Sequence, residues 1–158
     1  MRLVDILSED LVVPAVKSAE RDGLLKEVVD QIARARPDVD RDAALRVLVD
    51  RERIGSTGVG NGFAIPHGKL PNLRGMVACF ARSVSGVDFN SLDHQPAHLF
   101  LVLLAPEGAA GLHLKALARA SRLFKDTEFR AKLMQEGNAS ELWGIIRAED
   151  ARLAKLEC

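Results

Sequence analysis

The stretch RERIGSTGVGNGFAIPHGK, residues 51–69, marks the point where the helical pattern of the first part of the chain stops. Glycine recurs so densely in it that no regular helix can persist. The stretch ends in Ile-Pro-His-Gly, where Pro66 restricts the backbone before His67 and Gly68 lets the main chain turn after it. We therefore expect the His67 imidazole to be presented from a stiff turn rather than packed along a helix or strand.

His67 has the chemistry of a nucleophile at neutral pH, because the ordinary pKa of histidine is about 6.5 and the neutral imidazole carries a lone pair. Arg51 lies at the predicted end of the preceding helix, and Ser56 and Thr57 follow it in the glycine-rich loop. An arginine fork, hydroxyl donors and exposed backbone N–H groups are what the charged oxygens of a phosphoryl group require during transfer. The same residues are also compatible with a structural histidine and a solvated helix end.

His113 is the second histidine of interest, near the start of a predicted helix. From there it could donate a hydrogen bond to a phosphoryl oxygen on His67, with the helix N-terminus adding positive potential. The alternative is a partly buried helix histidine without a chemical role. Spacing in the sequence does not place the two histidines side by side.

Apolar periodicity and capping residues predict the other elements. A first helix is expected between Ser18, which precedes it, and Pro37, a second from its cap Asp40 to about Arg51 or Arg53, and a third from about Gly111 to Phe124. Asp126 and Ser140 are expected to cap two short C-terminal helices. Strands are expected over 76–84 and 99–105, the second so continuously apolar that both of its faces should be buried. This interleaving of helices and strands predicts a layered α/β domain.

The size and composition favour one domain. The chain has 158 residues, of which 47% are hydrophobic and 28% charged, and it is too short for two ordinary cores. We expect the domain to occupy residues 1–147 and residues 148–158 to form a frayed charged tail. Acidic and basic residues balance at 22 each, and aromatic residues make up only 4%, so nucleic acid is not an expected partner.

The chain shows no signal for export, membrane insertion or metal binding. The N-terminus lacks the pattern of a secretory signal and no apolar run is long enough to span a bilayer, so we expect a cytoplasmic protein. Cys79 is expected in the core and Cys158 as a mobile thiol, with no disulfide or thiolate site between them. His94 and His98 have the spacing of a helical metal pair, but Pro96 would break that helix.

The stretch 51–69 resembles the signature of the mannitol/fructose-type enzyme IIA family of bacterial phosphotransferase systems, most closely its nitrogen-regulatory branch. The likeness extends over roughly residues 3–147. It implies a mixed central β-sheet with helices on both faces. It also implies that His67 accepts a phosphoryl group from the phosphohistidine of a small carrier protein, and that Arg51 and His113 assist. We expect Ser56, Thr57 and the backbone of Gly68 to bind the phosphoryl oxygens.

The implied reaction is an in-line transfer between two imidazoles that needs no metal and no cofactor, because positioning and charge neutralisation suffice for an already activated phosphoramidate. The sequence leaves open which nitrogen of His67 is phosphorylated. An apolar rim of Val59, Phe63, Ile65 and Leu112 is expected to form the docking patch for the donor.

Three functions are compatible with the sequence. The first is a regulatory phosphocarrier whose phosphorylation state controls other proteins by contact; the resemblance suggests potassium-transport proteins and sensor kinases as partners. The second is a sugar-specific enzyme IIA that passes its phosphoryl group to an enzyme IIB. The third is a non-catalytic adaptor that has kept the fold, against which the presence of His67, Arg51 and His113 argues. The regulated target, the oligomeric state and any small-molecule effector are not given by the sequence.

Overall fold

Two long strands form the centre of the sheet. In a computed structural model that describes residues 1–135 and 137–157, β5 (Val77–Val87) and β6 (Ala97–Pro106) pair antiparallel. The strand predicted over 99–105 is confirmed, and every residue in that range is buried. The strand predicted over 76–84 is confirmed in place, although β5 continues to Val87.

Shorter strands extend this centre into a mixed sheet with the order β1-β5-β6-β3-β2 in the described part of the chain. β1 (Val12–Val13) runs parallel to β5, and β3 (Phe63–Ala64) runs parallel to β6. β2 (Gly58–Gly60) pairs antiparallel with β3, and β4 (His67–Leu70) also runs parallel to β6. From Gly55 onward, the glycine-rich stretch therefore contains short strands and no helix, as its composition predicts.

The two N-terminal helices are those that the sequence predicts. α1 (Arg21–Ala35) and α2 (Arg41–Ile54) follow two short 3-10 helices, η1 (Leu3–Asp5) and η2 (Glu9–Leu11). The apolar residues of the α1 pattern are all buried, which confirms its predicted face. Asp40 caps α2 by accepting a hydrogen bond from the backbone N–H of Ala43 at 3.1 Å, as predicted.

Three helices follow the last strand: α3 (Ala110–Phe124), α4 (Thr127–Met134) and α5 (Ala139–Leu156). Asp126 caps α4 through the N–H of Phe129, as predicted. The prediction that Ser140 caps the last helix is wrong. Asn138 occupies that position, where its side chain and that of Glu141 bind each other's backbone N–H in a capping box.

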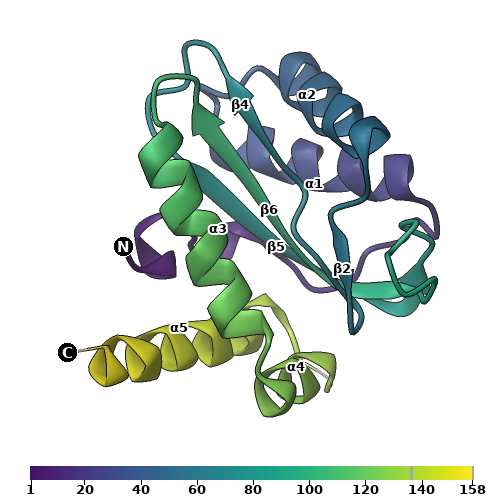
Figure 1. Ribbon diagram of the computed structural model, residues 1–158, viewed down its shortest axis with the longest axis vertical. Coiled ribbons are helices and arrows are strands. Elements are labelled where there is room, and N and C mark those ends of the chain that lie inside the picture. The colour runs from purple at the N-terminus through teal and green to yellow at the C-terminus, as the bar shows by residue number, and fades with distance from the viewer. Residues whose placement is uncertain (136, 158) are drawn as a thin grey trace.

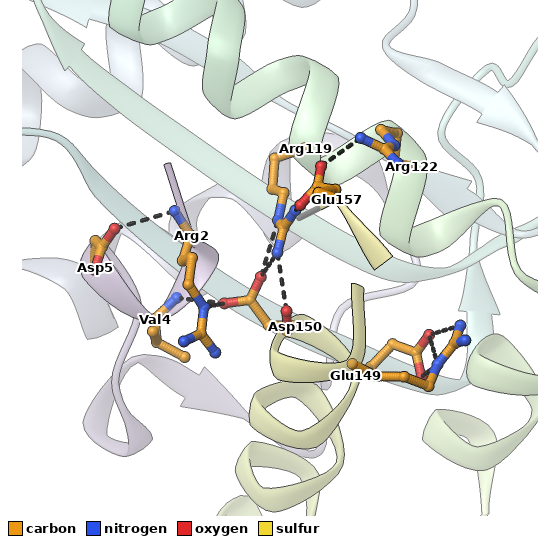
Figure 2. Close-up of polar contacts among 9 residues, drawn as sticks. Arg2, Val4, Asp5, Arg119, Arg122, Glu149, Asp150 and Glu157 are labelled. Carbon is orange, nitrogen blue, oxygen red and sulfur yellow. Dashed lines mark hydrogen bonds and ion pairs between the residues drawn. The ribbon is translucent and has the colours of Figure 1, made fainter. Parts of the chain in front are cut away.

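The predicted frayed tail is also wrong over its described part, because α5 continues to Leu156. A buried ion pair holds it against α3: the guanidinium of Arg119 donates to the buried carboxylate of Asp150 at 2.7 Å and 2.9 Å (Figure 2). Asp150 also accepts the backbone N–H of Val4, and Glu157 binds Arg119 and Arg122. Charged residues at this end are therefore structural. Cys158 lies outside the described residues.

The sheet separates two groups of helices (Figure 1). α1 and α2 pack against β5 and β4, whereas α3, α4 and α5 pack against β6, β5 and β1. The core fills both interfaces and includes the side chain of Cys79, which is buried as predicted. The single α/β domain with a mixed sheet and helices on both faces is confirmed. It leaves β4 between α2 and α3, and this arrangement positions the candidate site.

Candidate functional site

His67 is the first residue of β4. The chain pairs with β6 first in β3 and again in β4, and the pairing is interrupted between these two strands. The expectation that it lies outside any strand is wrong, but Ile65 and Pro66 interrupt the pairing before it. Pro66 is held in place because its carbonyl accepts the N–H of Leu103 at 2.9 Å. The Nδ1 atom of His67 lies 2.8 Å from the carbonyl oxygen of Ile65. Because a carbonyl can only accept, Nδ1 carries the proton and Nε2 keeps the lone pair.

The ring of His67 borders a cavity of about 630 Å³ between α2 and α3, along β4. Helix α2 contributes its last two turns, β4 its first three residues and α3 its N-terminal half. The cavity is lined by Val47, Asp50, Arg51, Ile54, His67, Gly68, Lys69, Ala110, His113, Leu114 and Leu117. The three residues expected to perform the chemistry, His67, Arg51 and His113, therefore share one cavity.

His113 lies beside His67, although the two residues are 46 positions apart in the sequence. The two ring centroids are 5.3 Å apart and the ring planes meet at 73°. His113 is only 6% exposed, and its Nε2 is buried without a hydrogen-bond partner in the described part of the chain. An unpaired buried nitrogen costs about 1–3 kcal/mol, so a ligand oxygen that paired with it would remove this penalty.

The protonation state of His113 depends on its surroundings. Burial lowers the pKa of His113 below the ordinary value, and the nearby His67 and Lys69 lower it further, because a charge on His113 would be repelled by these basic groups. The ring is therefore neutral at neutral pH and can donate one hydrogen bond. A negatively charged group bound at His67 would favour the protonated ring instead, because opposite charges a few ångströms apart stabilise each other.

Two cations lie on the wall of the cavity. Arg51, in the last turn of α2, donates from Nη1 to the carbonyl of Gly55 at 2.9 Å, which orients its guanidinium. Lys69 lies two residues after His67 on β4, on the same side of the strand, and is exposed. A cavity with a nucleophilic nitrogen, an unpaired buried ring nitrogen and two cations is suited to bind and transfer a phosphoryl group.

Comparison with known proteins gives the family. The family described as "Phosphoenolpyruvate-dependent sugar phosphotransferase system, EIIA 2" matches residues 5–149. The chain belongs to this EIIA family. Members of the family are phosphotransferase components, and homologues of this EIIA protein carry the name nitrogen regulatory protein. It is 39% identical over 154 residues to the nitrogen regulatory protein of Bradyrhizobium diazoefficiens, with 98% of this chain and 100% of that protein covered.

Other relatives include both sugar-specific and nitrogen regulatory proteins. The EIIA protein is 35% identical to part of the fructose-specific EIIABC component of Bacillus subtilis, covering 95% of this chain but 24% of that protein. The crystal structure of nitrogen regulatory protein IIA-Ntr from Neisseria meningitidis superposes with a TM-score of 0.83 at 30% identity, covering 90% of this chain and 97% of that one. The mannitol IIA structure from Escherichia coli has the same fold, with a TM-score of 0.76 at 17% identity, covering 89% and 98% of the two chains.

Two of the residues expected to bind phosphoryl oxygens lie elsewhere in the EIIA domain. The hydroxyl of Ser56 donates to the carbonyl of Phe89 at 2.9 Å and accepts the N–H of Gly58. Thr57 is buried, and its hydroxyl donates to the carboxylate of Glu52. Neither residue lines the cavity. The expectation for Ser56 and Thr57 is therefore corrected: their hydroxyl protons are used within the loop.

Gly68 lines the cavity, where its binding of a phosphoryl oxygen stays a prediction, and packing explains why this residue is glycine. A Cβ atom added to Gly68 would lie 2.2 Å from Cγ1 of Val47 on α2. Glycine is therefore needed for α2 to approach β4 this closely. That approach brings the last turn of α2, with Arg51, next to His67.

The predicted docking patch is corrected in two of its four residues. Phe63 stacks on Phe124 with ring centroids 4.3 Å apart, and both Phe63 and Ile65 are buried in the core. Leu112 and Val59 are exposed, as a docking role requires. Two exposed residues at the cavity rim were not predicted from the sequence: Ile54 is 84% exposed and Leu114 is 69% exposed.

Lys69 was missed as well, although the sequence contained a signal for it. A strand beginning at His67 puts residues 67 and 69 on one face, because side chains alternate along a strand. In residues 1–135 and 137–157 of the EIIA protein, no three His, Cys, Asp or Glu side chains gather closely enough to hold a metal ion. None of the helices in those ranges has the length and apolar character needed to cross a membrane.

Proposed function

We propose that this EIIA protein accepts a phosphoryl group on Nε2 of His67 from the phosphohistidine of a small carrier protein. The observation that carries the proposal is the pairing of two histidines in one cavity. Hydrogen bonding to Ile65 leaves Nε2 of His67 with its lone pair, and the buried Nε2 of His113 lacks a partner beside it. A phosphoryl group on His67 would supply an oxygen for His113.

In the proposed step, the lone pair of His67 Nε2 attacks phosphorus while the N–P bond to the donor imidazole breaks, and the donor nitrogen leaves with that electron pair. No proton has to move on His67 during the attack, because Nδ1 keeps its hydrogen on the Ile65 carbonyl. The positive charge that develops on the phosphorylated ring is stabilised by that carbonyl. This hydrogen bond therefore both orients the nucleophile and stabilises the product.

Charge on the phosphoryl oxygens is neutralised from three directions. Arg51 reaches the cavity from α2, Lys69 from β4 and His113 from α3. The oxygens gain charge-assisted hydrogen bonds that are stronger than neutral ones, particularly where the protein excludes water. We expect transfer from a purified phosphorylated carrier to persist in excess chelator, and loss of transfer under that condition would refute the metal-free step.

Docking of the donor is proposed to use Ile54 and Leu114, the exposed apolar residues that line the cavity, together with the exposed Leu112 next to His113 on α3. Exposed apolar side chains beside a polar centre are typical of protein interaction sites. Charge substitutions at Ile54 and Leu114 should raise the KM for the carrier and leave the unfolding free energy unchanged. An unchanged KM would exclude this surface from docking.

We propose that the output of the reaction is regulatory. Phosphorylation adds about two negative charges at the cavity mouth, which is enough to create or break an interface with a target protein. The nitrogen-regulatory names of the relatives in Bradyrhizobium diazoefficiens and Pseudomonas aeruginosa support this reading. Potassium-transport proteins and sensor kinases, acting in the cytoplasm, are the proposed targets.

A second candidate is transfer onward to an enzyme IIB in sugar uptake. It is favoured by the fructose-specific relatives of Bacillus subtilis and Haloferax volcanii and by the fold shared with mannitol IIA in complex with phosphorylated IIB. Mixing the phosphorylated protein with purified fructose-type and mannitol-type IIB domains separates the candidates. Rapid loss of the phosphoryl group to a IIB would support sugar transport, and retention would support the regulatory function.

The test of acceptance uses intact mass. Wild type, His67→Ala and His113→Ala are incubated with enzyme I, a histidine carrier protein and phosphoenolpyruvate. We expect an acid-labile gain of one phosphoryl group on wild type, none on His67→Ala and a slower gain on His113→Ala. No gain on wild type with donors that phosphorylate another EIIA would support the adaptor function instead.

A further inference from the structure

The last turn of α2 contains a buried carboxylate that the proposed chemistry does not use. Glu52 is 3% exposed, whereas its neighbour Arg51 reaches the cavity. Both oxygens of Glu52 bind the same residue: Oε1 accepts the backbone N–H of Thr57 at 3.0 Å, and Oε2 accepts the Thr57 hydroxyl. Burying a carboxylate costs free energy unless hydrogen bonds replace its lost hydration. The two hydrogen bonds to Thr57 are therefore needed to keep Glu52 in this position.

Thr57 stands at the open end of the β2–β3 hairpin. Gly58 pairs with Ala64, and one residue outside this pair the N–H of Ile65 donates to the Thr57 carbonyl at 3.1 Å. The Thr57–Ile65 hydrogen bond therefore continues the hairpin ladder by one step. By binding Thr57 at two points, Glu52 fastens this end of the hairpin to α2.

The next hydrogen bond in the series reaches the nucleophile. The carbonyl of Ile65, whose N–H is bound to Thr57, accepts from Nδ1 of His67 at 2.8 Å. A continuous path thus runs from the Glu52 carboxylate through both sides of the hairpin to the His67 ring. Movement of the Ile65 carbonyl would release the ring and would allow the proton to occupy Nε2, where it would block attack on phosphorus.

We infer that Glu52 is a positioning residue for His67. Through Thr57 and Ile65 it fixes the orientation and the Nδ1–H tautomer of the imidazole. This inference rests on the proposed function only in what it says about phosphoryl transfer; the effect on the tautomer holds for the unphosphorylated protein. A carboxylate suits the task because it has an acceptor for each Thr57 donor, whereas an amide replaces one acceptor by a donor.

Two variants weaken the path at different points. Glu52→Gln removes one acceptor, and Thr57→Val removes the hydroxyl while retaining the backbone N–H. Thr57→Ser restores the hydroxyl and is the conservative rescue. Asp150→Asn is the matched control, because it makes the same chemical change at the other carboxylate that is buried among the described residues, at the α3–α5 contact.

The primary readout is the tautomer of His67, measured by long-range ¹H–¹⁵N correlation above pH 7.5. We expect wild type, Thr57→Ser and Asp150→Asn to carry the proton on Nδ1, and Glu52→Gln and Thr57→Val to show a mixture. The maximal rate of phosphoryl transfer should fall about tenfold in those two variants because the nucleophile is misaligned. The KM for the carrier should stay the same, since the apolar rim is intact.

An Nδ1–H tautomer and a wild-type transfer rate in both variants would overturn the inference. A loss of rate in Asp150→Asn equal to that in Glu52→Gln would overturn it as well, by showing that any loss of stability has the same effect. If wild type accepted no phosphoryl group, the proposed function would fail instead, and the tautomer of the variants would still decide the role of Glu52.

Discussion

Gly68→Ala tests whether the approach of α2 to β4 builds the cavity. The added Cβ would lie 2.2 Å from Cγ1 of Val47. Carbon atoms in ordinary contact are at least about 3.5 Å apart, so either the side chain or the helix must move by about 1.3 Å. Valine in a helix strongly prefers one rotamer, so the side chain cannot swing aside without cost. Overpacking of this kind costs about 1–3 kcal/mol, which lowers the Tm of a domain of this size by about 2–12 °C.

The assay combines urea unfolding with the rate of phosphoryl transfer to His67. Gly68→Ala should lose both stability and rate, because α2 carries Arg51 away from the nucleophile as it moves. Val47→Ala in the same chain removes the clashing atom and should restore much of both, which a double-mutant cycle measures as a favourable coupling. If Gly68→Ala were as stable as wild type, or if Val47→Ala gave no rescue, the close packing of α2 on β4 would not be what requires glycine.

Three further predictions concern charge. Arg51→Lys should slow phosphoryl transfer about tenfold or more and leave urea unfolding unchanged, because a lysine lacks the two-pronged geometry of the guanidinium; equal rates would exclude a role for the fork. Asp150→Asn should lower the unfolding free energy by about 1–3 kcal/mol, since the buried guanidinium of Arg119 loses its buried counter-charge and keeps only the partly exposed carboxylate of Glu157; a loss below 1 kcal/mol in urea unfolding would contradict this. The folded pKa of His113 is lowered, so the unfolded chain binds more protons and stability should fall as the pH drops below the ordinary value of 6.5. His113→Gln should lack this part of the pH dependence, and an identical slope in the variant would show that His113 does not titrate as proposed.

Local signals in the sequence were sufficient for most helices and for the central strand. Asp40 and Asp126 cap the helices that they were predicted to cap, because an N-cap is decided by the few residues next to it. The Ser140 prediction failed because Asn138 and Glu141 form a reciprocal capping box two residues earlier. The strand over 99–105 was evident because it is apolar on both faces.

The features of the site that could not be predicted from the sequence depend on contacts between distant segments. Phe63 belongs to the same glycine-rich stretch as His67, but it is buried because Phe124, far away along the chain, stacks on its ring. The hydroxyl of Ser56 is used by the carbonyl of Phe89, a partner that no local pattern indicates. The family resemblance, and not the spacing in the sequence, predicted that His67 and His113 act together. Their rings come close only because folding brings β4 and α3 together.

The proposed chemistry requires that Nε2 of His67 accepts the phosphoryl group while Nδ1 keeps its proton on the Ile65 carbonyl. Its most direct test is NMR of ¹⁵N-histidine-labelled protein after phosphorylation by the carrier, in which ¹⁵N shifts and coupling to ³¹P identify the phosphorylated nitrogen. We predict a phosphoryl group on Nε2 of His67 and a protonated Nδ1. A phosphoryl group on Nδ1, or on any other residue, would refute this assignment.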